Sequence, residues 1–552
     1  MFIKRRVKEL IISLVILISL LPLFPRYAMV YTRNGKGMDP SLIKRLIQVI
    51  DSDTDKPIAG AIVISGNEME QTDEQGMARI KIEGEKVGVR ACGYLRAEVS
   101  IHASQETKPS SSSLRALYKA ARGKMIGLAE QIVTLPKEIE LTPFTPKGLY
   151  LSFYGIGDRK LREDALHLLR ETELNTLVID VKGDRGMIPY RSSIPLAVEI
   201  GAQKIITVKD MRGLISSLKD EGIYTIARIV AFKDNLLANS RPDLAVKDLN
   251  GKVWRDREGL AWTDPFKKEV WQYNIQIAIE AAQQGFDEIQ FDYIRFPDAL
   301  PVQLSMPNTM ENRVKAISGF LMEAKKRLLP YNVFLSADIF GYVCWNLNDT
   351  FIGQALENLA PHVDYLSPML YPSGFHHGIP GYRIPTAHPY EIVHLSLKKA
   401  QERTGLSPLR FRPWLQAFRD YAFDRRFFEE REMREQINGV ERFGSHGWLL
   451  WNPQNIYSRQ GLKREGASEF AYQRPEKTVK DSKLPRRPKE ESGPPSESVQ
   501  EEALAPDVSR QASEPATTLN PVMAEQQKPE EEPSSLAQSD PQEEPEVTED
   551  IK

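Results

Sequence analysis

Cysteine is almost absent from this sequence, since only Cys92 and Cys344 occur in 552 residues. Two cysteines exclude a disulfide framework, although a single bond between them remains possible. The chain also lacks a Walker loop, a dinucleotide fingerprint, a GxSxG elbow and a CxxC pair, which argues against nucleotide-binding, esterase and redox functions. The net charge of −2 gives no sign of a nucleic-acid partner.

Histidine is scarce as well, with eight residues in the chain. His376 and His377 are adjacent in "GFHHGIP", and adjacent histidines do not face one metal ion as an i, i+4 helical pair would. The acidic turn "DSDTDKP" lacks the glycine and the distal glutamate of a helix-loop-helix calcium site. We therefore predict no metal site and no cofactor.

Aromatic residues stop at Tyr472, and Pro, Glu, Ser and Gln dominate the chain beyond it. Residues 501–552 contain 14 acidic and 3 basic residues, so this end carries a net charge of −11 and the rest of the chain +9. Such a composition cannot bury enough apolar surface to offset the entropy of the chain. It predicts a disordered tail over residues 473–552.

The amino end has the layout of an export signal. The basic stretch "KRRVK" precedes an apolar run from Leu10 to Phe24. Its 15 residues are fewer than the roughly 20 needed to span a bilayer comfortably, and no small-x-small cleavage site is obvious in "FPRYAMVYT". We predict a signal peptide or a signal anchor over residues 1–29, and therefore an exported protein that is periplasmic, at the cell surface or anchored in the membrane.

Residues 42–143 contain short β-rich runs separated by turn clusters, a spacing typical of a small β-sandwich. The sequence "VIDSDTDKPIAGAIVI…TDEQGMARI…VRACGY" resembles the carboxypeptidase regulatory-like β-sandwich family, which implies an accessory module. A linker and a short helical stretch, "KPSSSSLRALYKAARGKMIGLAEQ", interrupt the pattern before a returning strand.

After Pro146 strands alternate with helices, which predicts a parallel sheet covered by helices. Eight such units over roughly 300 residues match an α/β fold of the (β/α)8, or TIM barrel, type across residues 147–470. One predicted helix begins at "TDPFKKEVW", with Asp264 as N-cap and Pro265 at the first helical position. The predicted strands are "GLYLSFYG", "TLVIDVKG", "YTIARIVAF", "EIQFDYIRF", "VFLSADIFGY", "YLSPMLYP", "LRFRPWLQAF" and "GWLLWNP".

Side chains alternate between the two faces of a strand, so parity separates an inward polar set from an outward apolar one. Asp180 and Lys182 share the inward face of the second strand, Gln290 and Asp292 that of the fourth, and Asp338 that of the fifth. Each carboxylate lies toward the carboxyl end of its strand, where barrel enzymes build their active sites.

A structural interpretation stays open beside the catalytic one. Asp180 would then pair with Lys182 or Arg228, and Asp292 with Arg295, as buried ion pairs inside a filled barrel. Burying several carboxylates is costly, and inward charge is a marker of function in barrels of this kind.

Two carboxylates on neighbouring strands suggest cleavage of a glycosidic bond, with one as acid and the other as nucleophile. Neighbouring strands lie roughly 4.8 Å apart, which favours the short carboxylate separation of retaining enzymes over the inverting alternative. Flat side chains of inward parity suit sugar rings; they are Tyr150, Tyr154, Tyr371, Trp414 and Trp451. We predict Asp292 and Asp338 as catalytic residues. The predicted substrate contacts are Asp180, Lys182, Arg228, Gln290, Arg295, Tyr371 and Trp414.

Several motifs resemble the bacterial barrel family described as "putative glycosyl hydrolase domain", which is distantly similar to α-amylase-like hydrolases. They are "NTLVIDVKGDRGMIPY", "YTIARIVAFKD", "YLSPMLYPS" and, most specifically, "GFDEIQFDYIRFPD". The resemblance covers about residues 147–457 and implies a glycoside hydrolase with Asp292 at the nucleophile position. Two positions depart from the α-amylase-like pattern: Gln290 replaces an arginine, whose charge Arg295 would supply, and Asp338 replaces a glutamic acid.

The leading hypothesis is an exported glycoside hydrolase that acts on a polysaccharide or oligosaccharide. A non-catalytic carbohydrate-binding protein of the cell surface is the main alternative, because the β-sandwich and the polar tail suit it equally. A polysaccharide-modifying transferase that uses the same carboxylates is a third.

Overall fold

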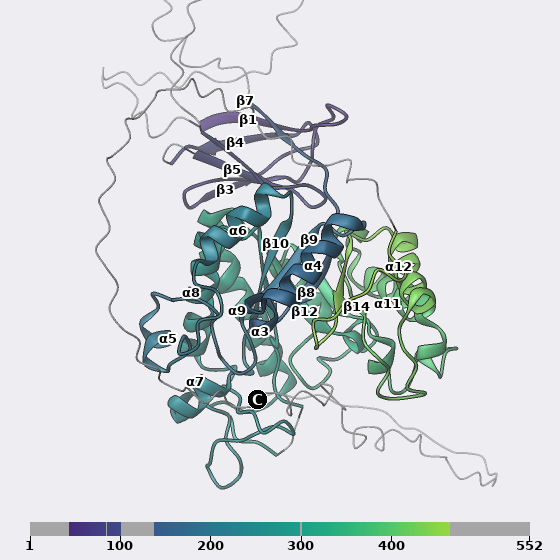
Figure 1. Ribbon diagram of the computed structural model, residues 1–552. Helices are drawn as coiled ribbons and strands as arrows, with labels where there is room; N and C mark the ends of the chain where they lie inside the picture. Colours follow the sequence, from purple (N-terminus) through teal and green to yellow (C-terminus); the bar gives the residue numbers. More distant parts are fainter. Residues whose placement is uncertain (1–43, 84–85, 101–136, 299–300, 464–552) are drawn as a thin grey trace, which may run out of the picture.

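The computed structural model describes residues 44–83, 86–100, 137–298 and 301–463 (Figure 1). The predicted export segment, the inserted linker and the predicted tail lie outside these ranges. Within them, no helix combines the length and the apolar character needed to cross a membrane.

The amino-terminal part forms two β-sheets that share one apolar cluster. The first sheet has the order β4 (Met77–Lys81), β1 (Lys44–Asp51) and β7 (Lys137–Leu141); the second has the order β3 (Glu68–Gln71), β2 (Ile62–Ser65), β5 (Lys86–Arg90) and β6 (Ala97–Ser100). Val49 and Ile80 of the first sheet and Val63 and Val89 of the second are fully buried in that cluster. The likeness to the carboxypeptidase regulatory-like family stays a prediction.

The larger part is a closed barrel of eight parallel strands, so the predicted fold is confirmed. Seven of the eight strands lie within the stretches that the alternation predicted, and β8 begins one residue before its stretch, at Lys147. In barrel order they are β8 (Lys147–Leu151), β9 (Thr176–Lys182), β10 (Tyr224–Val230), β11 (Glu288–Asp292), β12 (Phe334–Phe340), β13 (Tyr365–Met369), β14 (Trp414–Gln416) and β15 (Trp448–Trp451).

Helices cover the outside of the barrel (Figure 1). They are α3 (Phe153–Gly157), α4 (Arg159–Glu171), α5 (Pro195–Glu199), α6 (Met211–Asp220), α7 (Asn235–Ser240), α8 (Lys268–Gln284), α9 (Met310–Leu328), α10 (Leu356–Leu359), α11 (Pro389–Thr404) and α12 (Glu430–Phe443). Short 3-10 turns span Pro242–Leu244, Leu329–Tyr331, Gly341–Cys344, Ala360–His362, Pro372–Gly374, Pro385–Ala387 and Pro408–Arg410.

The predicted start of α8 was wrong. The helix begins at Lys268, with Lys267 as its N-cap. Asp264 instead accepts hydrogen bonds from the backbone of Phe266 at 2.9 Å and of Ser305 at 2.6 Å. Its carboxylate therefore joins two loops, and this long-range contact replaces the helix cap that local sequence suggested.

The predicted parity of the strands is confirmed on β9 and β11. Ile179 of β9 and Phe291 of β11 are fully buried in the outer core, between the barrel and the helices. Val178, which has the opposite parity, belongs to a separate apolar cluster inside the barrel with Tyr150 and Leu449. The barrel is thus filled by side chains, and its polar inward residues lie among them.

The amino-terminal sheets cover the amino-terminal end of the barrel strands (Figure 1). Arg90 Nε lies 3.6 Å from Asp364 Oδ2, and Arg96 Nε donates to Asp287 Oδ1 at 3.4 Å. Asp287 and Asp364 directly precede β11 and β13, which places both contacts at that end. The sheets therefore leave the carboxyl ends of the strands, on the opposite side, to other functions.

Candidate active site

The strand register places the two predicted catalytic carboxylates at one level of the barrel. Phe291 of β11 lies opposite Ala337 of β12, so the next residues along, Asp292 and Asp338, are neighbours across the two strands. Both are nearly buried, with exposures of 4% and 1%. Their common height, which the sequence suggested, follows from this parallel pairing.

Arg228 of β10 connects three of the inward carboxylates. Its Nη1 donates to Asp180 Oδ1 at 2.6 Å, and its Nε and Nη2 donate to Asp292 Oδ2 at 3.0 and 2.5 Å. The same Nε lies 3.9 Å from Asp338 Oδ2. A guanidinium presents several donors in a rigid fork, which suits this shared role. Arg228 thus supplies the positive charge beside Asp292 that we had expected from Arg295, and that expectation was wrong.

Two aromatic rings hold the guanidinium. Its Cζ lies 5.3 Å from the ring centroid of Tyr150 and 4.9 Å from that of Trp451, and these two rings stack on each other at 4.1 Å. The hydroxyl of Tyr150 also donates to Asp180 Oδ2 at 2.6 Å. Rings and carboxylates together fix Arg228 in one orientation, because each contact uses a different part of the group.

Asp338 has a different environment from Asp292. Trp414 Nε1 donates to its Oδ1 at 2.8 Å, whereas its Oδ2 is buried without a hydrogen-bond partner among the described residues. Burial, followed by the charge of Asp292, raises the pKa of Asp338 well above its ordinary value of 3.8. A carboxyl group in such a place favours the protonated form, and its free oxygen is a natural position for the proton.

The backbone beside Asp292 is strained. Tyr293 adopts a left-handed conformation with φ of 48°, which is rare for a bulky residue. This turn directs its amide N–H to Asp292 Oδ1 at 2.5 Å. Together with Arg228, the amide gives both oxygens of Asp292 a hydrogen-bond donor. Strain of this kind persists where the surrounding structure enforces it, and it is concentrated at functional sites.

The remaining predicted contacts lie around this cluster. The hydroxyl pKa of Tyr371 is raised by burial and then by the charges of Asp338 and Asp292, so Tyr371 lies within electrostatic reach of both carboxylates. Trp414 is 1% exposed, so its ring is covered and the observed role of its indole is to hold Asp338. Gln290, one layer deeper, donates to Ser367 Oγ at 3.2 Å and is fully buried.

The structure places two predicted contacts outside the cluster. Lys182 is fully buried and donates to Asp234 Oδ2 at 2.6 Å, not to Asp180. Arg295 lies over the rings of Trp262, at 4.8 Å, and Tyr293, at 5.3 Å. Neither cation reaches the carboxylates of the cluster, and whether either contacts a substrate stays a prediction.

The inward parity assigned to Tyr154 was wrong. β8 ends at Leu151, and Tyr154 belongs to the short helix α3, where it is 56% exposed. The inward direction predicted for Tyr150, from the same stretch "GLYLSFYG", is confirmed, because Tyr150 lies within β8 and packs inside the barrel.

A second buried charge pair, which the strand pattern did not predict, lies below the cluster. Arg412 Nη2 donates to both carboxylate oxygens of Glu288, at 2.5 and 2.6 Å, and Ser336 Oγ donates to Glu288 Oε1 at 2.5 Å. Both charged side chains are fully buried. The alternation of side chains along the strand could have revealed this pair, because Glu288 shares the inward face of β11 with Gln290 and Asp292. This pair lies at the start of the strands, near the covered end, where a structural role is expected.

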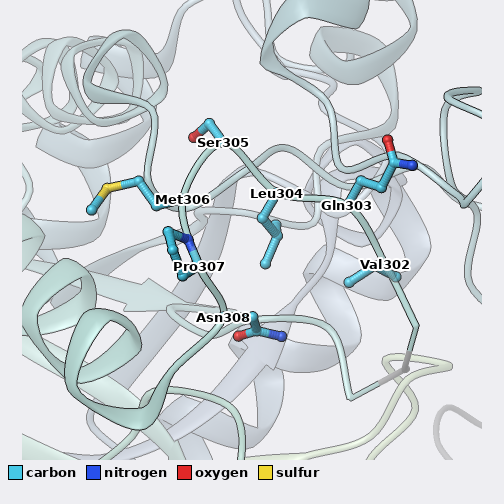
Figure 2. Close-up of a pocket in the computed structure, with 7 residues that line it drawn as sticks. All are labelled: Val302, Gln303, Leu304, Ser305, Met306, Pro307 and Asn308. Carbon is cyan, nitrogen blue, oxygen red and sulfur yellow. The ribbon is translucent and has the colours of Figure 1, made fainter.

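One hollow among the described residues lies apart from these carboxylates. It has a volume of about 500 Å³ and is lined by the loop segment 302–308, between β11 and α9 (Figure 2). The backbone of Gln303 exchanges hydrogen bonds with that of Lys247, at 3.1 and 2.7 Å, so the hollow belongs to the outer loops. None of the predicted site residues lines it.

The barrel matches a known protein family. The family model described as "Putative glycosyl hydrolase domain" matches residues 148–457, from the first barrel strand to just beyond the last. The chain belongs to this glycosyl hydrolase family. The match spans all the residues of the Arg228 cluster, and the predicted resemblance is confirmed for this part of the chain.

Solved structures resemble this glycosyl hydrolase domain at low overall similarity. A hypothetical protein from Ruminiclostridium thermocellum is 40% identical, with 35% of this chain and 97% of that chain covered and a TM-score of 0.31. The glycoside hydrolase domain of PgaB (BpsB) from Bordetella bronchiseptica is 13% identical over 57% and 95%, with a TM-score of 0.40. A class V chitinase from Nicotiana tobaccum is 11% identical over 57% and 96%, with a TM-score of 0.35. No curated protein matches the chain.

Proposed function

We propose that this protein is a glycoside hydrolase that cleaves a polysaccharide or oligosaccharide with Asp292 as nucleophile and Asp338 as acid. The observation that carries the proposal is the unequal environment of the two carboxylates. Asp292 accepts hydrogen bonds from Arg228 and from the Tyr293 amide, whereas Asp338 is buried with one free oxygen and a raised pKa. Paired carboxyl groups whose environments separate their protonation states are typical of acid and base assignments.

The chemistry follows from these assignments. A carboxylate oxygen of Asp292 attacks the anomeric carbon while the proton of Asp338 passes to the glycosidic oxygen, so one C–O bond forms as another breaks. Water then gives a proton to ionised Asp338 and attacks the anomeric carbon, which releases Asp292 and the sugar. Arg228 stabilises the negative charge that returns to Asp292 in the second step.

The separation of the two groups supports retention of configuration. Arg228 Nε lies 3.0 Å from Asp292 Oδ2 and 3.9 Å from Asp338 Oδ2. The two oxygens are therefore no further apart than the sum of these distances, about 6.9 Å. Retaining enzymes hold their carboxyl groups about 5 to 5.5 Å apart and inverting enzymes roughly 6.5 to 9.5 Å, so most of the inverting range is excluded.

Release of reducing ends tests the proposal. The full chain would be incubated with soluble α-glucans and bacterial exopolysaccharides, with Asp292→Asn and Asp338→Asn as matched inactive controls. New reducing ends from the wild-type chain alone are the expected result. Equal release by the wild-type chain and both variants would place the activity elsewhere and remove the proposed mechanism.

A second candidate is a carbohydrate-binding protein without catalysis. The double ion pair of Arg228 favours it, because a carboxylate held by a buried guanidinium is stabilised in its ground state and attacks less readily. Binding of a glycan that no preparation of the protein cleaves would support this candidate. The free oxygen of Asp338 favours the hydrolase, since a purely structural network would satisfy it.

We also propose that the protein acts outside the cytoplasm. The support is the basic start and the apolar run of the first 29 residues, which fit a signal peptide or an anchor. Cell fractionation with an antibody against the barrel tests this proposal: a cytoplasmic protein with an intact amino terminus would contradict it.

A further inference from the structure

The loop after β12 contains two consecutive strained residues. Thr350 and Phe351 both adopt left-handed backbone conformations, with φ of 55° and 59°. A β-branched and a bulky aromatic side chain are among those that disfavour this region most. Glycine would remove the cost at either position, so the side chains themselves need a reason to be there.

The surrounding structure enforces this conformation. Asp349 is 1% exposed and accepts hydrogen bonds from the amides of Phe351 at 3.1 Å and Gly353 at 3.0 Å. Arg313 of α9 holds the same carboxylate with two further hydrogen bonds, at 2.6 and 3.0 Å. The turn is therefore a rigid element whose shape does not depend on the Phe351 side chain.

The same turn is attached to both strands that carry the proposed catalytic residues. The amide of Phe296, just beyond β11, donates to the carbonyl of Ile352 at 2.9 Å. The side chain of Gln354 accepts from the amide of Phe340 at 2.9 Å and donates to the carbonyl of Asp338 at 3.4 Å. The turn thus lies at the carboxyl end of the barrel, joined to the two strands of the candidate active site.

Phe351 is exposed, in contrast to its neighbours in the turn. It is 52% exposed, whereas Ile352 beside it is 5% exposed and Asp349 is 1% exposed. The Arg313 guanidinium is 5.9 Å from the ring centroid, so one contact supports the ring while about half of its surface stays open. A flat, open aromatic ring on a rigid turn is a surface on which the C–H face of a pyranose can stack.

We propose that Phe351 is a stacking platform for a sugar unit of the substrate, at the rim of the site beside the two catalytic strands. The proposal rests on the proposed function, which it extends from the cleaved bond to a neighbouring unit of the glycan. Its ligand class is a pyranose ring within a longer chain. The strain of the turn serves to present the ring, as strain does at other binding sites.

Affinity electrophoresis of the full chain tests the platform, with gels that contain a soluble α-glucan, a soluble β-glucan or a bacterial exopolysaccharide. All variants carry Asp292→Asn, so that the glycan is not cleaved during the run. Phe351→Ala is expected to lose affinity about tenfold, the size of one stacking contact. Phe351→Tyr keeps a flat ring and is expected to bind as the chain with Asp292→Asn alone does.

Two matched controls separate stacking on this ring from general apolar contact and from the loss of any exposed aromatic side chain. Phe351→Leu keeps an apolar side chain on the same strained backbone but has no flat face, so it is expected to lose affinity as the alanine variant does. Phe427, in another loop, is 59% exposed and is not among the residues with positive φ, so Phe427→Ala is expected to have no effect. Wild-type affinity in Phe351→Leu, or an equal loss in Phe427→Ala, would overturn the platform.

The result also separates this inference from the proposed function. If the wild-type chain releases reducing ends while Phe351→Ala binds normally, hydrolysis stands and the platform is wrong. If the chain binds a glycan through Phe351 but cleaves none, the platform stands and hydrolysis is wrong. If none of the three polysaccharides slows the migration of the chain whose Phe351 is intact, the platform is overturned.

Discussion

Arg228 and Asp292 form the central charge pair of the barrel, with Nη2 2.5 Å from Oδ2 and Nε 3.0 Å from the same oxygen. The third nitrogen of the guanidinium serves Asp180 at 2.6 Å. One cation therefore compensates two buried carboxylates, and a third, Asp338, lies close enough to feel its charge. Any change at one member redistributes the charge of the others, which makes the cluster testable by substitution.

Replacement of Asp292 by asparagine keeps the shape of the side chain and removes its charge. Turnover is expected to fall by roughly 10³-fold, equivalent to about 4 kcal/mol of transition-state stabilisation. Stability is expected to fall by less than the roughly 3 to 5 kcal/mol of an unpaired buried charge, because Arg228 keeps Asp180. Reducing-end release and urea unfolding of the same preparation measure both effects.

Asp180→Asn is the matched control for that variant. Asp180 has the same exposure of 4% and the same partner, but it lies on the far side of the guanidinium from Asp338. We expect a similar change in stability and a much smaller loss of turnover. Equal losses of turnover would mean that the charge of the cluster matters and that Asp292 has no special role.

Removal of the shared cation is expected to destabilise the barrel in a pH-dependent way. Burial raises the pKa of Asp180 above 3.8, and Arg228 is the main group that opposes this rise. In Arg228→Met the pKa of Asp180 therefore rises further. A raised carboxyl pKa contributes stability that is present below the unfolded value, near 3.9, and is lost as the pH increases.

The free energy of unfolding of Arg228→Met is accordingly expected to be lower than that of the wild type by roughly 3 to 5 kcal/mol at pH 7. This difference is expected to shrink as the pH approaches about 4. Urea unfolding of the variant and the wild type across that range gives the difference. A deficit that stays constant from pH 7 to pH 4 would show that lost packing against Tyr150 and Trp451, and not charge, is responsible.

The strand pattern made much of this site predictable. Alternation along β11 placed Asp292 inside the barrel, and the count of strand and helix units gave the fold. Local pattern does not contain the partners, however: it suggested Arg295 as the partner of Asp292, and only the packed structure shows that Arg228 is paired with this carboxylate. Asp264 shows the same limit, because its contact with Ser305 depends on two loops that meet only in the folded chain.

The buried ion pair of Glu288 was not predicted, for a different reason. The parity of Glu288 is the same as that of Asp292, but Glu288 lies at the start of the strand, away from the carboxyl ends where barrel enzymes build their active sites. The covered end of the barrel explains its burial, since the amino-terminal sheets and Phe144 close this side; Phe144 packs on the ring of Tyr224 at 5.4 Å. Tyr224 in turn donates to Glu288 at 3.0 Å. A domain contact that no strand pattern contains therefore decides the environment of this carboxylate.

The contact between the sheets and the barrel is expected to contribute to stability. Arg90 and Asp364 are 3% and 6% exposed, so Arg90→Met leaves a buried carboxylate without its cation, at a cost of about 3 kcal/mol. The matched control is Lys86→Met, because Lys86 and Glu98 are 69% and 46% exposed and such a pair contributes less than about 1 kcal/mol. Urea unfolding followed by tryptophan fluorescence compares them; an equal effect of both variants would contradict a stabilising domain contact.

Asp338 is expected to be protonated in the folded protein. Its pKa is raised by burial and by the charge of Asp292, so the folded state holds a proton that the unfolded chain releases above pH 3.8. Stability is then fully present below that pH and declines as the pH rises toward the folded pKa. Asp338→Asn cannot ionise, and its amide oxygen still accepts the hydrogen bond of Trp414.

Asp338→Asn is therefore expected to be at least as stable as the wild type at pH 7, with a difference that disappears near pH 4. Its turnover is expected to fall by roughly 10² to 10⁴-fold, as for loss of a general acid. Thermal melting from pH 4 to pH 8, with reducing-end release at each pH, measures both. A variant that is less stable than the wild type at every pH would mean that Asp338 is ionised in the folded protein, and the acid would then have to be sought in another group near Asp292.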